Sequence, residues 1–309
     1  MALNKEQWAS DIQENLFKDN AILQRAVNHD GWINNKTVHV PQAGANPSIT
    51  KNRTSFPATI GQRTDTDLTY DVDAYYLDPI MIEKGQEAKF LAYDKRMSVL
   101  NQQIATMDEY ITNNVLYKWA PSGAATQVRT TGSTDALALA PSATGTRKAI
   151  TLADIQKAKA ILDSQNVPQA GRILLMQSDI YNSHFLSISN IAQAYAFGQA
   201  TLPSGVVGRI MGFDVMIRST VVVYDNTGTP IIKAVGSNGA PSSEATSDNM
   251  ACLAYHPNFV CRAIGSVDVN INENAPGFYG STIIESLQHL GAAKLRTDQK
   301  GIVAIIQAA

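Results

Sequence analysis

Residues 86–119 read QEAKFLAYDKRMSVLNQQIATMDEYITNNVLYKW and contain the longest helical pattern in the chain. Apolar side chains recur there at steps of three or four residues, and neither proline nor glycine interrupts them. They are Met97, Leu100, Ile104, Met107, Ile111 and Val115. Such a helix would extend roughly 45 to 50 Å, more than a compact domain of this size usually needs. We therefore expect a spine helix laid against a sheet.

A segment of strands and loops precedes this helix. Val38 and Val40 alternate with polar residues, and residues 41–63 are rich in proline, glycine, asparagine and threonine. Within this segment we expect the two arms of a long hairpin, residues 53–60 and 64–76, which turn near Gly61 and Gln62.

The second arm of this hairpin alternates polar and apolar side chains, as strand geometry requires. One parity carries Asp65, Asp67, Thr69, Asp71 and Asp73, and the other carries Leu68, Tyr70, Val72 and Ala74. A hairpin with one face almost wholly polar cannot bury itself, and isolated hairpins are marginal in water. We expect it to project from the body and to be stabilised by assembly.

Basic residues of the same segment offer partners for the acidic face. Arg53 and Arg63 lie at matching parity on the opposite side, with Lys51 beyond them. The carboxylates could form a solvated strand face, or hold Ca²⁺, although the EF-hand order and its glycine are missing. In a third interpretation, acidic and basic faces meet across the hairpin or between subunits. The candidate contacts are then Lys51, Arg53, Arg63, Asp65, Asp67, Asp71 and Asp73; exposed pairs contribute about 0 to 1 kcal/mol each but can fix register.

The remaining pattern mixes helices with antiparallel strands and lacks a βαβ rhythm, which indicates an α+β fold. Residues 4–28 have the spacing of an amphipathic helix or arm, and residues 121–146 the composition of a long surface loop or extended hairpin. Thr151 and Asp154 fit a capping box that opens a helix. Further predicted elements are a strand at 172–176, a helix capped by Ser178 that runs to about 185, strands after 205, and β-rich runs at 267–271, 282–290 and 302–306.

Composition limits the classes of function. The chain has 309 residues, 44% of them hydrophobic and 17% charged, which favours a folded protein over a disordered one. A formal net charge of −2 argues against a dedicated nucleic-acid binder. Two cysteines are too few for a disulfide framework, so we assume a reducing cytoplasm. We find no signal peptide and no membrane-spanning run, and expect no membrane partner.

Catalytic and metal-binding patterns are weak. The five histidines, His29, His39, His184, His256 and His289, match no metalloprotease spacing and no nucleophile motif. Cys252, His256 and Cys261 offer three irregularly spaced ligands where structural zinc takes four, so buried free thiols are preferred. The SITK at residues 48–51 matches SxxK but lies in a loop, and no phosphate-binding motif is present. We predict no catalytic residue, no cofactor and no metal.

Three phrases link this pattern to a known family. They are VPQAGRILLMQSDIY at 167–181, VGRIMGFDVMIRST at 207–220 and YGSTIIESLQHLGAAKLRTDQKGIVAI at 279–305. Together with the order of arm, hairpin, long helix and closing strands, they resemble the major capsid proteins of tailed bacteriophages with the Hong Kong 97 type fold. The likeness covers nearly the whole chain in organisation and about a third of it in phrase.

This resemblance implies a domain organisation. Residues 1–36 would be the N-terminal arm and residues 37–77 the extended loop, which lies over a neighbouring subunit. Residues 78–170, completed by 263–295, would form the peripheral domain with the spine helix. Residues 171–262, completed by 296–309, would form the axial domain.

The resemblance also implies a function and partners. The chain would assemble with itself as hexamers and pentamers into an icosahedral shell around double-stranded DNA, without sequence-specific binding. A scaffold protein and a portal would take part in assembly in the bacterial cytoplasm, and decoration proteins could follow. Covalent crosslinking through Lys51 lacks an identifiable acceptor, so non-covalent locking is expected. The alternatives are an encapsulin-like compartment, a tail or baseplate protein, and a cytosolic hydrolase using His184 or His256.

Overall fold

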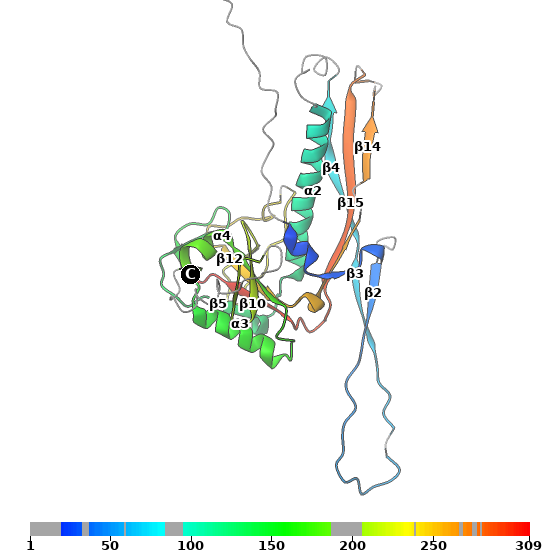
Figure 1. Ribbon diagram of the computed structural model, residues 1–309, viewed down its shortest axis with the longest axis vertical. Coiled ribbons are helices and arrows are strands. Elements are labelled where there is room, and N and C mark those ends of the chain that lie inside the picture. The colour runs from blue at the N-terminus through cyan, green and yellow to red at the C-terminus, as the bar shows by residue number, and fades with distance from the viewer. Residues whose placement is uncertain are drawn as a thin grey trace, which may run out of the picture.

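The computed structural model describes residues 20–32, 37–58, 60–83, 95–186, 206–237, 239–265, 268–273, 277–278 and 280–309. Figure 1 shows an elongated molecule with a rounded body, a tall blade of strands and one helix, and a long loop that projects from the base of the blade. In the described parts of the chain, no helix is both long and apolar enough to cross a bilayer.

The blade is a five-stranded sheet built around its longest strand, β15 (Thr282–Lys294). Strand β4 (Asp73–Ile82) pairs antiparallel with one edge of β15. Along the other edge, β13 (Val260–Ile264) and β14 (Asp268–Asn272) pair one after the other, and β1 (Val27–Asn28) adds in parallel to β13.

Helix α2 (Lys95–Trp119) packs along this sheet and ends where the sequence predicts. Its 25 residues give a length of about 38 Å; the predicted residues 86–94 lie outside the described part. The face of β15 toward the helix is buried at Ile284 and Leu290, while Glu285 on the other face is exposed. Gln103 of α2 donates to the Ile284 carbonyl at 3.2 Å and accepts from Ser286 at 2.9 Å, so its buried amide is satisfied.

The rounded body holds a seven-stranded sheet. Its order is β5 (Gln127–Arg129), β16 (Ile302–Ile306), β12 (Asn249–Tyr255), β8 (Arg172–Gln177), β10 (Phe213–Arg218) and β9 (Gly208–Ile210), with β11 (Val222–Tyr224) paired to β12. Strands β8, β12 and β16 are buried throughout, because alternate residues face two separate cores.

One of these cores includes α2, and the other includes α3 (Leu152–Ser164), which packs on β16 and β5. The predicted capping box is confirmed: Thr151 accepts from the Asp154 amide while the Asp154 carboxylate accepts from the Thr151 amide. Trp119 joins the two sheets, because its indole Nε1 donates to the Cys261 carbonyl in β13 at 2.9 Å and its ring lies 5.5 Å from that of Tyr255 in β12.

The smaller elements complete the chain. A short helix α4 (Ser178–Ile180) continues into a π-helical turn (Tyr181–Phe185), and 3₁₀ turns lie at Ala21–Gln24, Asp30–Trp32, Ala124–Thr126 and Pro257–Phe259. Two ribbons are formed by β2 (Thr37–Gln42) with β3 (Thr66–Asp71) and by β6 (Ala136–Leu137) with β7 (Thr146–Arg147).

The structure corrects the predicted hairpin. Residues 53–60 form no strand in the described part; the first arm is β2, and it pairs with β3. The second arm also breaks at Val72, after which β4 leaves the ribbon and pairs with β15. The cause is long-range pairing, which local alternation cannot reveal.

Other local expectations also change. Most of the helix expected at 4–28 lies outside the described residues, and its last residues form a 3₁₀ turn and β1 instead. Gln177, not Ser178, caps α4, because its side-chain oxygen accepts from the amides of Asp179 and Ile180. Residues 121–146 contain β5 and β6 as well as loop, and both β5 and α3 pack in the body.

Candidate assembly interface

The projecting loop, residues 43–65, leaves the blade through the β2–β3 ribbon (Figure 1). Asp65 closes the base of the loop: its carboxylate accepts from the Gly44 amide at 2.9 Å and from the Arg63 guanidinium at 2.6 and 2.8 Å. The hydrogen bonds from Arg63 and Gly44 lower the pKa of Asp65, and the bond from Arg63 has the larger effect. The base of the loop is therefore fixed by charge-assisted bonds, although the carboxylate is exposed.

A small apolar core anchors the ribbon to the blade. Tyr70 and Val72 are buried with Val38, Cys261 and Ala263. A Cβ at Gly291 would lie 2.9 Å from the Tyr70 ring, so this contact needs glycine. The Gln42 side chain adds a hydrogen bond of 2.8 Å to the Leu295 carbonyl. The ribbon is thus rigidly attached where the loop begins.

The predicted acidic residues lie on one exposed face, as expected, but their partners differ from the prediction. Asp67 pairs with His39 at 2.5 Å, and Asp71 accepts from Thr37 at 3.1 Å, both across the ribbon. Asp73 pairs at 2.8 Å with Lys118 of α2. Arg63 pairs with Asp65 on its own side of the loop. Among the described residues, Lys51 and Arg53 pair with none of these aspartates, and a contact between subunits stays a prediction.

Lys51 and Arg53 lie farther out on the loop, and both are exposed. Within the described residues, neither forms a hydrogen bond or an ion pair. Residues 43–64 contain no aspartate or glutamate. Because Arg63 is held by Asp65, the distal loop presents two cations whose charge the loop does not balance.

The same loop exposes large apolar side chains. Ile49 is 98% exposed, Phe56 79% and Ile60 95%. Scattered apolar residues are common on surfaces, but three on one projecting loop without a core of its own form a surface suited to a partner. This loop, with its cations and apolar side chains, is the candidate interface, and exposure of the apolar side chains is the feature that sequence reasoning missed.

The zinc candidate made of Cys252, His256 and Cys261 is not assembled. Cys252 lies in the core beneath α3, and Cys261 lies in the ribbon core. Burial raises the pKa of Cys252 to about 12 and that of Cys261 to about 11, so both thiols stay protonated. The ring of His256 bonds the Asn258 amide and the Ala170 carbonyl. Among the described residues, no three His, Cys, Asp or Glu side chains gather as metal ligands would.

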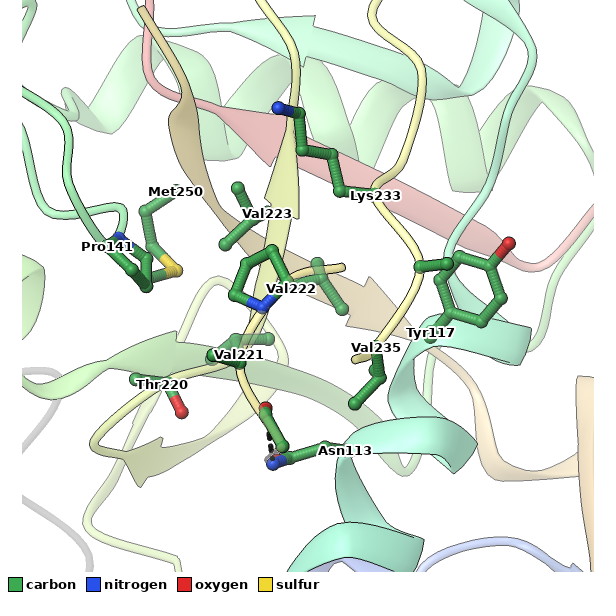
Figure 2. A pocket seen from close by; sticks show the side chains of 14 residues that line it. Asn113, Tyr117, Pro141, Thr220, Val221, Val222, Val223, Lys233, Val235 and Met250 are labelled. Atoms are coloured by element: carbon green, nitrogen blue, oxygen red, sulfur yellow. Dashed lines mark hydrogen bonds between the residues drawn. The ribbon is translucent and has the colours of Figure 1, made fainter. Parts of the chain in front are cut away.

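A cavity of about 190 Å³ lies where the body meets α2 (Figure 2). Val221, Val222, Val235 and Met250 give it an apolar lining. At its edge, the Asn113 side chain of α2 donates to the Gly239 carbonyl at 3.1 Å. Arg218 donates to the Asn113 oxygen at 2.7 Å, so the polar groups at this edge are engaged in holding the body to the helix.

Comparison with known proteins agrees with this geometry. The sequence model of one family, described as phage capsid protein, matches residues 2–308. No curated protein matches the chain. Among solved structures, the capsid of Ralstonia phage GP4 aligns at a TM-score of 0.68 and 13% identity, over 99% of this chain and 96% of that chain.

Two further solved structures extend the comparison. The Cyanophage Pam1 capsid asymmetric unit aligns at a TM-score of 0.66 and 10% identity, over 98% of this chain and 96% of that chain. A chain of Mycobacterium phage Che8 aligns at a TM-score of 0.60 and 17% identity, over 98% of this chain and 97% of that chain. The α+β fold of the Hong Kong 97 type is therefore confirmed. Since the family match extends over almost the whole chain, this chain belongs to the phage capsid protein family and is a component of the virion capsid.

Proposed function

We propose that the chain self-assembles, as hexamers and pentamers, into the icosahedral shell that encloses the double-stranded DNA of a tailed phage. The observation that carries this proposal is the loop at residues 43–65, which projects from an anchored ribbon and exposes three large apolar side chains that its own chain leaves uncovered. A loop on one end of an elongated subunit makes a heterologous contact, and such contacts close into rings when the rotation permits. The role is structural, and no catalytic step is involved.

The contact residues divide into two groups in this proposal. Arg63, Asp65, Asp67, Asp71 and Asp73 shape and orient the ribbon through contacts within their own chain. Lys51 and Arg53 are the charges directed toward a neighbour. Because exposed pairs contribute little individually, the apolar side chains supply most of the contact energy and the charges supply register.

The surrounding assembly follows the same reasoning. The blade would form the peripheral domain and the body the axial domain. Assembly in the host cytoplasm would use a scaffold protein and a portal, and the finished shell could carry decoration proteins. The net charge of −2 suits a container that holds DNA without binding it tightly.

The test is expression of the full chain with and without candidate scaffold proteins, followed by sizing chromatography and negative-stain electron microscopy. We expect closed shells tens of nanometres across. A monodisperse monomer or small oligomer that stays unassembled with every scaffold would contradict the proposal.

A further inference from the structure

The cavity of about 190 Å³ beside α2 has walls from separate parts of the chain (Figure 2). The helix supplies Asn113 and Tyr117, and the body supplies β11, Pro141 and residues 233–235 and 239–241. An engineered cavity of about 150 Å³ with an apolar lining stays dry and binds benzene. The cavity beside α2 therefore has room for one aromatic ring with a small substituent.

The body side of the cavity is apolar. Met250 is 0% exposed, and Val221 and Val222 are buried as well. A methionine thioether makes favourable contacts with aromatic rings, and close packing against methyl groups adds dispersion energy. Since a water molecule needs two to four polar partners to occupy a cavity, this lining favours an apolar occupant over water.

The groups at the rim set the charge of the ligand. Among the described lining residues, Lys233 carries a charge, and its ammonium lies 2.8 Å from the Asp248 carboxylate and 3.0 Å from the Ser243 carbonyl. Asp248 is 1% exposed, so the two charges balance each other away from water. At another edge, hydrogen bonds engage both polar atoms of the Asn113 side chain. A charged ligand would be buried without a partner, which costs more than burying a neutral ring of the same size.

We propose that this cavity is a binding site for a small, uncharged aromatic molecule of about six to nine non-hydrogen atoms. The ring packs between Tyr117 of α2 and the valines of β11, so the ligand joins the body to the helix of the blade. A ligand that binds the folded chain and not the unfolded chain stabilises the fold as its concentration exceeds its Kd. This site belongs to the single subunit and does not depend on shell assembly.

Toluene is the probe for this site, and benzoate, the same ring with a charged substituent, is its matched control. Thermal unfolding of the unassembled full-length subunit would be followed as the ligand concentration increases. We expect toluene to raise the unfolding temperature in a saturable way, with a Kd on the order of 0.1 to 1 mM, and benzoate to leave it unchanged. The absence of a saturable shift with toluene, or an equal shift with benzoate, would overturn the proposal.

Two valine-to-phenylalanine substitutions locate the bound ring. Val235→Phe fills the cavity from its wall, whereas Val207→Phe adds the same atoms on the body outside the cavity, where Val207 is 38% exposed. We expect Val235→Phe to weaken toluene binding at least about tenfold, and Val207→Phe to bind toluene as the wild type does. Undiminished binding to Val235→Phe, or an equal loss in both variants, would rule out this cavity as the site.

A measurement on the wild-type chain keeps the proposal testable if Val235→Phe does not fold. The methyl group of Met250, assigned with Met250→Leu, would be followed by NMR, because an aromatic ring shifts the resonance of a methyl group that it contacts. We expect the Met250 resonance to move with the Kd found by unfolding, while that of Met97, which is 53% exposed on α2, stays in place. A Met250 resonance that moves no more than that of Met97 would contradict the proposal.

Discussion

Removing the exposed apolar side chains of the loop should weaken assembly without weakening the subunit. The perturbation is the double substitution Ile49→Ser and Ile60→Ser. These side chains are 98% and 95% exposed, so they contribute nothing to the core of their own chain. Surface substitutions of this kind change the free energy of unfolding by about 0.5 kcal/mol or less. The free subunit should therefore unfold at the wild-type temperature.

The effect on assembly follows from burial. Fully burying an isoleucine side chain is worth about 1.5 to 3 kcal/mol. If each is half covered by a neighbour, the pair contributes about 1.5 to 3 kcal/mol per loop contact. Since 1.4 kcal/mol is a factor of about ten, the critical concentration for assembly should rise about 10- to 100-fold.

The assay is light scattering across a dilution series of purified full-length protein, with thermal unfolding of the unassembled subunit measured in parallel. Ile231→Ser is the matched control, because Ile231 is 62% exposed on the body and lies outside the loop. The reasoning would be refuted if the double variant assembled at the wild-type concentration, or if its subunit melted at a lower temperature.

Three further predictions concern the subunit itself. Asp154→Ala should destabilise it by about 2 to 4 kcal/mol in urea unfolding, because the buried carboxylate accepts from the amides of Thr131 and Thr151 and caps α3; an unchanged midpoint would contradict this. Gly301→Ala should lower the free energy of unfolding by more than about 2 kcal/mol, because its Cβ would lie 2.3 Å from the Phe259 ring and Gly301 has a φ of +89°. Gly171→Ala, at a φ of +79° with open space around it, should lower the free energy of unfolding by about 1 kcal/mol. Equal losses would show that the Phe259 ring moves aside. Burial lowers the pKa of His29 and His256, so their contribution to stability is present above about 6.5, the unfolded value, and is lost as pH falls through the folded values. His256→Asn should flatten this acid limb of the unfolding profile, and an unaltered limb would exclude His256 as a cause.

Elements decided by neighbouring residues were predictable from the sequence. The spine helix ends at Trp119 because its apolar steps end there, and the capping box of α3 joins Thr151 to Asp154 within one turn. Strand β16 is apolar at every position because both of its faces are buried, so its run stands out. In each case the pattern of residues that predicts the element lies within the element itself or beside its end.

Elements decided by distant partners were not predictable. Strands β3 and β4 form one alternating run in the sequence, yet β3 pairs with β2 and β4 pairs with β15, about 200 residues away. Strand β5 lies in a polar, glycine-containing stretch and is a strand because β16 binds it in parallel. The loop's acidic and basic residues were found, but their partners His39 and Lys118 depend on the same distant pairing.

The most direct test of the central claim is cryo-electron microscopy of particles assembled from the full-length chain, at a resolution that traces the main chain. We predict a closed shell in which residues 43–65 of each subunit leave their own blade and cover the blade of a neighbour. Particles without a closed shell, or a shell in which this loop touches no other chain, would contradict the account.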